Sequence, residues 1–152
     1  MELIIIRGQR DGGKSTTSAM VHNALAKKKA NLLYFKLPCN EIEIGKKAQD
    51  FFSVFEYLGK KVAIISRGDD AATLDNDMTL IIEMYHPIII VVCARSIDRQ
   101  GSAYNMLTEK YGNLIKKENI FWSQFDEDYS QIAKCKAEVV AQIMNKISNI
   151  KL

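Results

Sequence analysis

One segment of the sequence has the residue types and spacing that bind phosphate. Residues 8–15 read Gly-Gln-Arg-Asp-Gly-Gly-Lys-Ser and match the pattern G-x-x-x-x-G-K-[ST]. Gly12 and Gly13 can take positive φ and bring backbone N–H groups close to phosphate oxygens. Lys14 would reach the β- and γ-phosphates, and Ser15 would place its hydroxyl on Mg²⁺. The segment therefore predicts a phosphate-binding loop, and the alternative is a glycine-rich turn with a surface lysine.

The surroundings of this segment favour the first interpretation. It follows the apolar run Leu3–Ile6 and opens a predicted helix from Ser15 to about Ala26. The N-terminus of that helix would add unpaired N–H groups and a partial positive charge. The motif requires this order of strand, loop and helix. Asp11 stands against it, because an acid in the loop repels phosphate unless it points away.

The segment resembles the Walker A loop of the P-loop NTPase superfamily, and within it the small nucleotide and metabolite kinases. The resemblance implies that ATP or another nucleoside triphosphate binds with Mg²⁺, on a sheet of about five parallel strands. The residues that it would place around the nucleotide are Gly8, Arg10, Asp11, Gly12, Gly13, Lys14, Ser15 and Thr16. It does not fix one reaction, because kinases, GTPases, ATPases and motor proteins share this loop.

Such sites usually add an acid after a second strand, where it holds Mg²⁺ directly or through water. The run Val62–Ile65 is followed by Ser66 rather than by an acid, and Asp69 comes three residues later. We expect Asp69 to support the metal, with Ser66 on a metal-bound water. Asp98, after the next apolar run, is the alternative. Asp69 and Asp70 are equally well placed to cap a helix that begins near Ala71.

Arginines gather in the loops that follow the predicted strands. Arg10, Arg67, Arg95 and Arg99 would lie at one edge of the sheet, where guanidinium groups stabilise the charge of phosphoryl transfer. Small kinases carry an arginine-bearing lid in about this place, so the segment 95–101 resembles a short lid. We predict that Lys14, Asp69, Arg95 and Arg99 form the catalytic set. Each arginine taken singly is more often a solvated surface residue.

Other nucleotide-related signatures are missing. Residues 98–101 match D-x-x-G but begin too far beyond the strand, and no N-K-x-D segment follows. The glycine-rich loop and H-R-D segment of protein kinases are also absent. His22 and His86 are far apart in the sequence, so we expect surface or helix-end residues rather than metal ligands.

The elements that must position these loops follow from the hydrophobic spacing. Short, continuously apolar runs predict strands covered on both faces, and apolar residues at helical spacing predict helices between them. The strands are expected at Leu3–Ile6, Leu32–Leu37, Val62–Ile65, Ile88–Val92 and Ile120–Trp122. The helices are expected at 15–26, 48–58, 71–85, 103–114 and 133–152, with Gly59 ending the second and Ser102 capping the fourth. This order predicts a three-layer α/β/α fold with a mostly parallel sheet of about five strands.

Composition sets the remaining limits. The 152 residues carry 21 Lys and Arg against 18 Asp and Glu, and the net charge of +3 gives no strongly basic nucleic-acid footprint. The longest apolar run, 88–94, is too short to span a bilayer, and the N-terminus does not resemble a signal peptide. Cys39, Cys93 and Cys135 are odd in number and widely spaced, which favours reduced thiols and a cytoplasmic location. We expect residues 1–152 to form one domain.

Two functional hypotheses follow. The first is a P-loop enzyme that binds ATP·Mg²⁺ and transfers the γ-phosphate to a small-molecule acceptor or hydrolyses it. The second is a nucleotide-binding switch or adaptor with little chemistry of its own, motivated by the missing acid directly after either strand. A domain that binds only phosphate or sulfate is a third and weaker interpretation. The acceptor, the preferred base and the oligomeric state are left open by the sequence.

Overall fold

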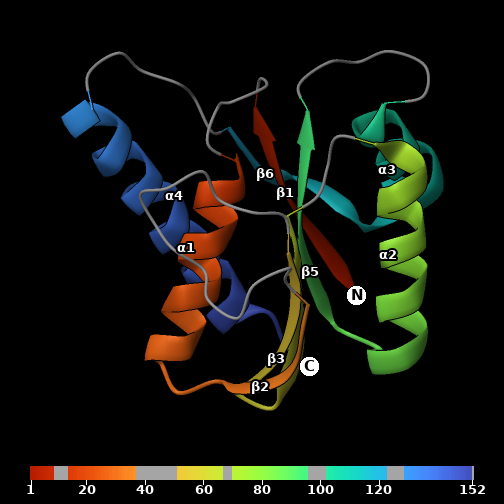
Figure 1. Ribbon diagram of the computed structural model, residues 1–152, viewed down its shortest axis with the longest axis horizontal. Helices are drawn as coiled ribbons and strands as arrows, with labels where there is room; N and C mark the ends of the chain where they lie inside the picture. The colour runs from red at the N-terminus through yellow and green to blue at the C-terminus, as the bar shows by residue number, and fades with distance from the viewer. Residues whose placement is uncertain (9–13, 37–50, 67–69, 96–101, 123–128, 152) are drawn as a thin grey trace.

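A computed structural model of the protein describes residues 1–8, 14–36, 51–66, 70–95, 102–122 and 129–151. Within these ranges one six-stranded sheet is covered by helices on both faces, with α1 and α4 on one face and α2 and α3 on the other (Figure 1). In chain order the elements are β1 (Glu2–Gly8), α1 (Lys14–Lys27), β2 (Asn31–Lys36), β3 (Phe52–Tyr57), β4 (Lys60–Ile65), α2 (Ala71–Tyr85), β5 (Ile89–Arg95), α3 (Ala103–Tyr111), a 3₁₀ turn (Gly112–Leu114), β6 (Ile115–Trp122) and α4 (Tyr129–Asn149).

The strands are ordered β2-β3-β4-β5-β1-β6 across the sheet. The neighbours β4–β5, β5–β1 and β1–β6 are parallel, whereas β3 runs antiparallel to both β2 and β4. The α/β class predicted from the sequence is confirmed. The expectation of a mostly parallel sheet of about five strands is met only in part, because the described sheet has six strands and two of its five neighbour pairs are antiparallel.

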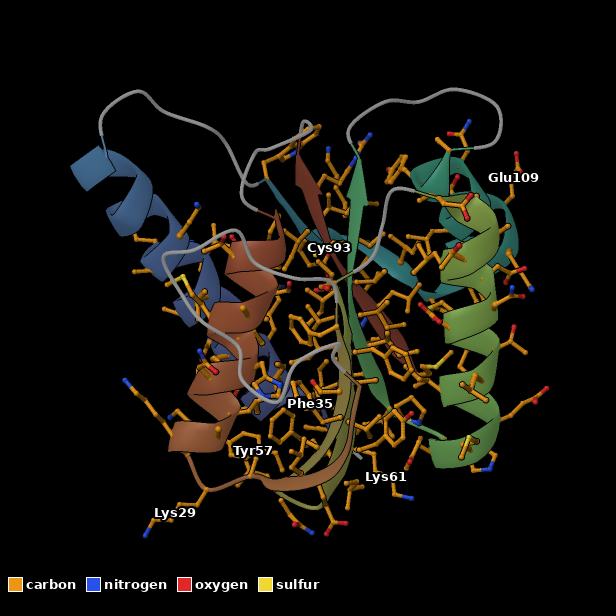
Figure 2. All side chains as sticks on the ribbon, viewed as in Figure 1. Lys29, Phe35, Tyr57, Lys61, Cys93 and Glu109 are labelled. Carbon is orange, nitrogen blue, oxygen red and sulfur yellow. The ribbon has the colours of Figure 1, made fainter. Side chains whose placement is uncertain are left out.

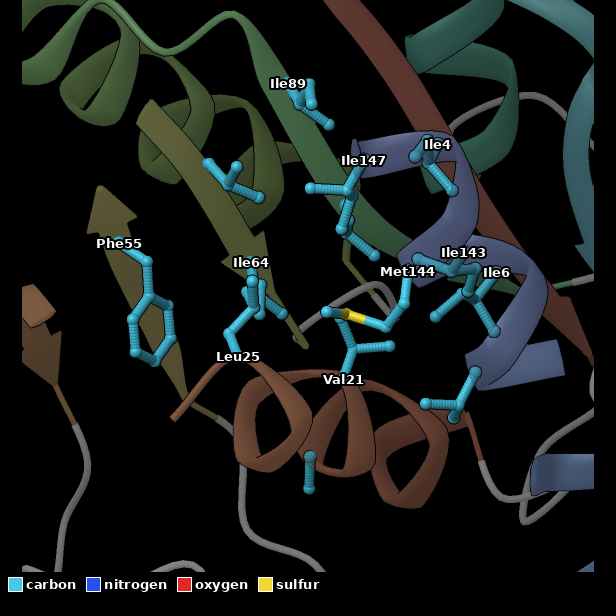
Figure 3. Close-up of a cluster of buried hydrophobic side chains, with 14 of the residues drawn as sticks. Ile4, Ile6, Val21, Leu25, Phe55, Ile64, Ile89, Ile143, Met144 and Ile147 are labelled. Atoms are coloured by element: carbon cyan, nitrogen blue, oxygen red, sulfur yellow. The ribbon is translucent and has the colours of Figure 1, made fainter. Parts of the chain in front are cut away.

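The parallel strands are apolar on both faces because helices cover both of them. Along β1, Ile4 and Ile6 pack toward α1 and α4, while Leu3 and Ile5 pack toward α2 and α3. All four side chains are fully buried. Figure 3 shows the first of these two cores, where Val21 and other α1 side chains meet α4 residues over the sheet. Continuous apolar runs therefore predicted these strands correctly.

The helix expected over 48–58 is wrong for the residues that the structure describes there. Residues 52–57 form β3 instead, and Phe51 and Phe55 pack against α1 while Phe52 and Val54 pack toward α2. Side chains four positions apart share one face in a strand as well as in a helix. The spacing of Phe51 and Phe55 thus fits either element, and burial on both faces removed the alternation that marks a strand.

Gly59 belongs to a hairpin turn and does not follow a helix. Leu58 and Gly59 both have positive φ, at 51° and 72°, and Tyr57 pairs with Lys60 across the turn. Two central residues of this kind make the two-residue turn that matches the twist of a hairpin. The turn folds β3 directly back onto β4, which explains why β3 is antiparallel.

The helix ends agree with the sequence signals. Asp70 caps α2 by accepting a hydrogen bond from the Thr73 backbone N–H at 3.0 Å, and Ser102 caps α3 through the Asn105 N–H at 3.1 Å. His86 ends α2 in the left-handed conformation, as expected for a helix-end residue. These caps fix where each helix leaves the edge of the sheet.

Candidate functional site

The predicted phosphate loop lies between the end of an interior strand and the start of a helix. β1 ends at Gly8 and α1 begins at Lys14. Gly8 pairs in register with Arg95, the last residue of β5, so both lie together at the carboxyl edge of the parallel strands. Ligands of open α/β sheets gather at this edge. Four of the expected loop residues lie outside the described residues: Arg10, Asp11, Gly12 and Gly13.

The first turn of α1 holds the rest of the motif. Lys14 and Ser15 are its first two residues, and their side chains lie outside the described part of the chain. Thr16 is half-buried in the same turn, and Thr17 is fully buried behind it. The first N–H groups of a helix have no partner within it, and the helix dipole adds partial positive charge there. The backbone of this turn can therefore hold an anion.

Ser66, which we expected on a metal-bound water, is bonded to the backbone of Phe51. Its backbone N–H and its hydroxyl both donate to the carbonyl oxygen of Phe51, and its hydroxyl accepts from the Phe51 N–H at 2.7 Å. The side chain is buried. Ser66 thus connects the end of β4 to the residue that precedes β3, and its hydroxyl proton is used within the chain.

Of the two neighbouring aspartates, the structure describes Asp70, which caps α2. Asp70 accepts hydrogen bonds from the Thr73 N–H and the Thr73 hydroxyl, and these bonds lower the pKa of the Asp70 carboxyl. Capping therefore occupies the Asp70 carboxylate. Asp69, Arg67, Asp98 and Arg99 lie outside the described residues. Arg95 is placed by its backbone at the edge, beside Gly8.

A cluster of one arginine and two aromatic rings lies at the same edge and was missed by the sequence analysis. The guanidinium carbon of Arg7 is 3.5 Å from the centroid of the Tyr104 ring and 4.7 Å from that of Trp122. Arg7 is buried, whereas Trp122 is 50% exposed. The sequence carried one signal for this cluster, since Arg7 is a charged residue at the end of an apolar strand. A buried cation requires partners.

His22 is not the surface residue that the sequence suggested. It is buried, its Nδ1 lies 2.9 Å from the hydroxyl of Ser53, and its ring contacts those of Phe35, Phe51 and Phe55. Burial lowers the pKa of His22 to about 4. The imidazole is therefore neutral at physiological pH and joins α1 to the antiparallel strands β2 and β3.

No family model, curated protein or solved structure matches the chain. The arrangement must therefore be interpreted from its own residues.

The described part of the chain contains no cluster of three or more His, Cys, Asp and Glu side chains that would hold a metal ion by itself. None of its helices is both long and apolar enough to cross a membrane. The edge nevertheless combines a helix N-terminus, a lysine and a serine in its first turn, and an arginine on the adjacent strand. Residues of these types can hold a polyphosphate with its own Mg²⁺, where the phosphates supply metal ligands and one or two protein oxygens complete the shell.

Proposed function

We propose that the protein binds a nucleoside triphosphate with Mg²⁺ at this edge and transfers or hydrolyses the γ-phosphate. The observation that carries the proposal is the position of the motif. Residues 8–15 run from the last residue of β1, an interior strand, to the first turn of α1. The motif requires this context in order to present its backbone N–H groups to phosphate.

Each residue has a chemical role in this proposal. Lys14 neutralises charge on the β- and γ-phosphates, and Ser15 binds Mg²⁺ through its hydroxyl. Asp69 completes the metal shell from the loop after β4. Arg95, in register with Gly8, stabilises the charge that develops on the transferred group, and Arg99 assists it from the following loop. The remaining residues that contact the nucleotide in this proposal are Gly8, Arg10, Asp11, Gly12, Gly13 and Thr16.

A second function is favoured by the bonding of Ser66. Its hydroxyl is engaged with the Phe51 backbone, so no acid or mobile hydroxyl directly follows β4. A site with a weak metal shell can bind a nucleotide and turn it over slowly, as a switch or adaptor does. Phosphate release from pure protein separates the two functions, because an enzyme turns over repeatedly and a switch stays bound to its nucleotide.

Calorimetric titration tests the proposal. ATP and GTP are titrated with and without Mg²⁺ into the wild type, Lys14→Ala and Lys27→Ala. Lys27 is the matched control, because it is an exposed lysine in the last turn of the same helix. We expect Mg²⁺-dependent binding that is lost in Lys14→Ala and kept in Lys27→Ala, with all three proteins equally folded by circular dichroism. Equal nucleotide affinity in the wild type and Lys14→Ala would overturn the proposal.

A further inference from the structure

The cluster of Arg7, Tyr104 and Trp122 lies on a definite face of the sheet. Side chains alternate along β1, and Leu3 and Ile5 pack toward α2 and α3. Arg7 continues that alternation and contacts Tyr104, which lies in the first turn of α3. Trp122 is the register partner of Arg7 on β6, so its side chain projects to the same face. The cluster thus lies on the α2–α3 face, whereas α1 covers the opposite face (Figure 1).

Trp122 has the properties of a stacking surface. Half of its surface is exposed, although it is a large aromatic residue at the end of a sheet strand. The guanidinium of Arg7 lies against its ring and against Tyr104, and this packing restricts the orientation of the indole. A rigid and partly exposed indole binds planar rings, and nucleobases stack on such side chains whatever their sequence.

The cluster is close to the proposed phosphate loop but separate from it. Arg7 directly precedes Gly8, and its other register partner, Ala94, directly precedes Arg95. A ring on Trp122 would therefore lie at the same sheet edge as the phosphates. That ring would lie on the face of the sheet opposite α1. The triphosphate is proposed to bind at the first turn of α1, which begins at Lys14.

From this placement we infer that Trp122 stacks the nucleobase of a second ligand, distinct from the triphosphate, on the α2–α3 face of the sheet edge. The inference rests on the proposed function for the location of the triphosphate. Trp122 contacts the ligand, and Arg7 and Tyr104 are positioning residues that hold the indole. The ligand class is a nucleoside or a nucleoside monophosphate, whose phosphate can extend toward the edge at Gly8 and Arg95.

Intrinsic fluorescence reports on this subsite directly, because Trp122 is the only tryptophan in the sequence. The probes are Mg²⁺ with inorganic tripolyphosphate, Mg²⁺ with a non-hydrolysable ATP analogue, the adenosine, guanosine and cytidine monophosphates, and ribose 5-phosphate. A parallel titration of free tryptophan amide corrects the measured emission for light absorbed by the bases. We expect a nucleoside monophosphate to quench Trp122 in the presence of tripolyphosphate, and ribose 5-phosphate to leave the emission unchanged.

Three variants test whether stacking is the cause, with calorimetry as the readout where the fluorophore is removed. Trp122→Leu should weaken binding of the monophosphate roughly 5- to 100-fold, and Trp122→Phe should recover part of the loss. Tyr111→Leu is the matched control, because Tyr111 lies at the far end of α3 beneath another cation, Lys110. Arg7→Lys should shift the Trp122 emission maximum and weaken binding less than Trp122→Leu does.

The outcomes separate this inference from the proposed function. Quenching by the ATP analogue but not by tripolyphosphate would overturn it, because the base of the triphosphate would then occupy Trp122. Absence of quenching by all three monophosphates would overturn it as well. Quenching that persists in Lys14→Ala, which is expected to lose triphosphate binding, would support the inference whether or not the proposed function survives.

Discussion

The two halves of the sheet differ in what their residues do. In the parallel half, formed by β4, β5, β1 and β6, the strands β1, β5 and β6 end in Gly8, Arg95 and Trp122 at one edge. In the other half, formed by β2 and β3 and called the hairpin half after the β3–β4 turn, the rings of Phe35 (labelled in Figure 2) and Phe55 contact that of His22 of α1. The parallel half gathers groups that can bind a ligand. The hairpin half buries polar groups that already have partners within the chain.

This difference shows that burial of a polar residue does not by itself identify a site. His22 and Ser53 are buried, bonded to each other and enclosed by rings, so their role is structural. Arg7 is equally buried but lies against a half-exposed tryptophan at the sheet edge. We therefore expect substitutions in the hairpin half to change the free energy of unfolding, and substitutions at the edge to change ligand affinity.

The largest expected effect on stability comes from the hairpin half. Phe55→Ala removes a buried ring between β3 and α1, and such truncations cost about 3–5 kcal/mol. Leu32→Ala on β2 is the control, because this side chain is 46% exposed and should change stability by less than about 0.5 kcal/mol. Urea unfolding measures both, and equal midpoints for the two variants would break the distinction. Nucleotide affinity of the folded Phe55→Ala protein should be unchanged.

Acidification should lower the free energy of unfolding by an amount similar to, or slightly smaller than, the loss in Phe55→Ala. The pKa of His22 is lowered by burial from 6.5 to about 4, so the unfolded chain binds a proton there that the folded chain does not. Stability is therefore full above pH 6.5 and falls as the pH drops toward 4, by roughly 3 kcal/mol. The urea midpoint measured across this range should show a steeper decline for the wild type than for His22→Gln. Parallel declines would place the acid sensitivity elsewhere.

Substitution of Lys60, at the end of the sheet opposite the candidate site, should change the free energy of unfolding by a smaller amount. Its Nζ donates to the carbonyl oxygens of Ile147 and Ser148 at 3.1 and 3.0 Å, which satisfies the C-terminal end of α4. Lys60→Met should lower the free energy of unfolding by about 1–3 kcal/mol, because these hydrogen bonds are lost while the apolar part of the side chain is kept. Lys61→Met, at the next position of β4, is the control and should be close to neutral. A protein as stable as the wild type after Lys60→Met would show that water replaces the amine.

The smallest effect is a gain in stability. Leu58 is 60% exposed and has a φ of 51°, a conformation that costs a leucine about 1 kcal/mol. Leu58→Asn should raise the free energy of unfolding by about 0.5–1 kcal/mol, since asparagine tolerates this turn position. Thermal unfolding measures the gain, and a lower melting temperature would mean that Leu58 makes a stabilising contact.

The sequence predicted β1 and β5 better than β3 for a physical reason. Leu3–Ile6 and Ile88–Val92 are continuous, β-branched runs, and few elements other than a doubly covered strand have that pattern. Phe51 and Phe55 fit a helix face as well as a strand face, and only the turn at Leu58 and Gly59 decides between them.

The candidate site was likewise predictable from the sequence only in part. The phosphate-loop motif could be predicted because its chemistry is local in the chain, from Gly8 to Ser15. The pairing of Gly8 with Arg95 depends on which strands are neighbours, and the bond from Ser66 to Phe51 depends on the hairpin. The contact of Arg7 with Tyr104 joins residues far apart in the sequence, so spacing along the chain could not reveal it.

The central claim is that a triphosphate binds at the carboxyl edge of the parallel half. Amide chemical-shift mapping of the isotope-labelled protein tests it most directly, on addition of Mg²⁺ with a non-hydrolysable ATP analogue. We predict the largest shifts at Gly8, in the first turn of α1 from Lys14 to Thr17 and at Arg95, with small shifts in β2 and β3. These shifts should disappear in Lys14→Ala and persist in Lys27→Ala. Shifts concentrated at the opposite end of the sheet, near Lys60 and Lys61, or none at all, would contradict the claim.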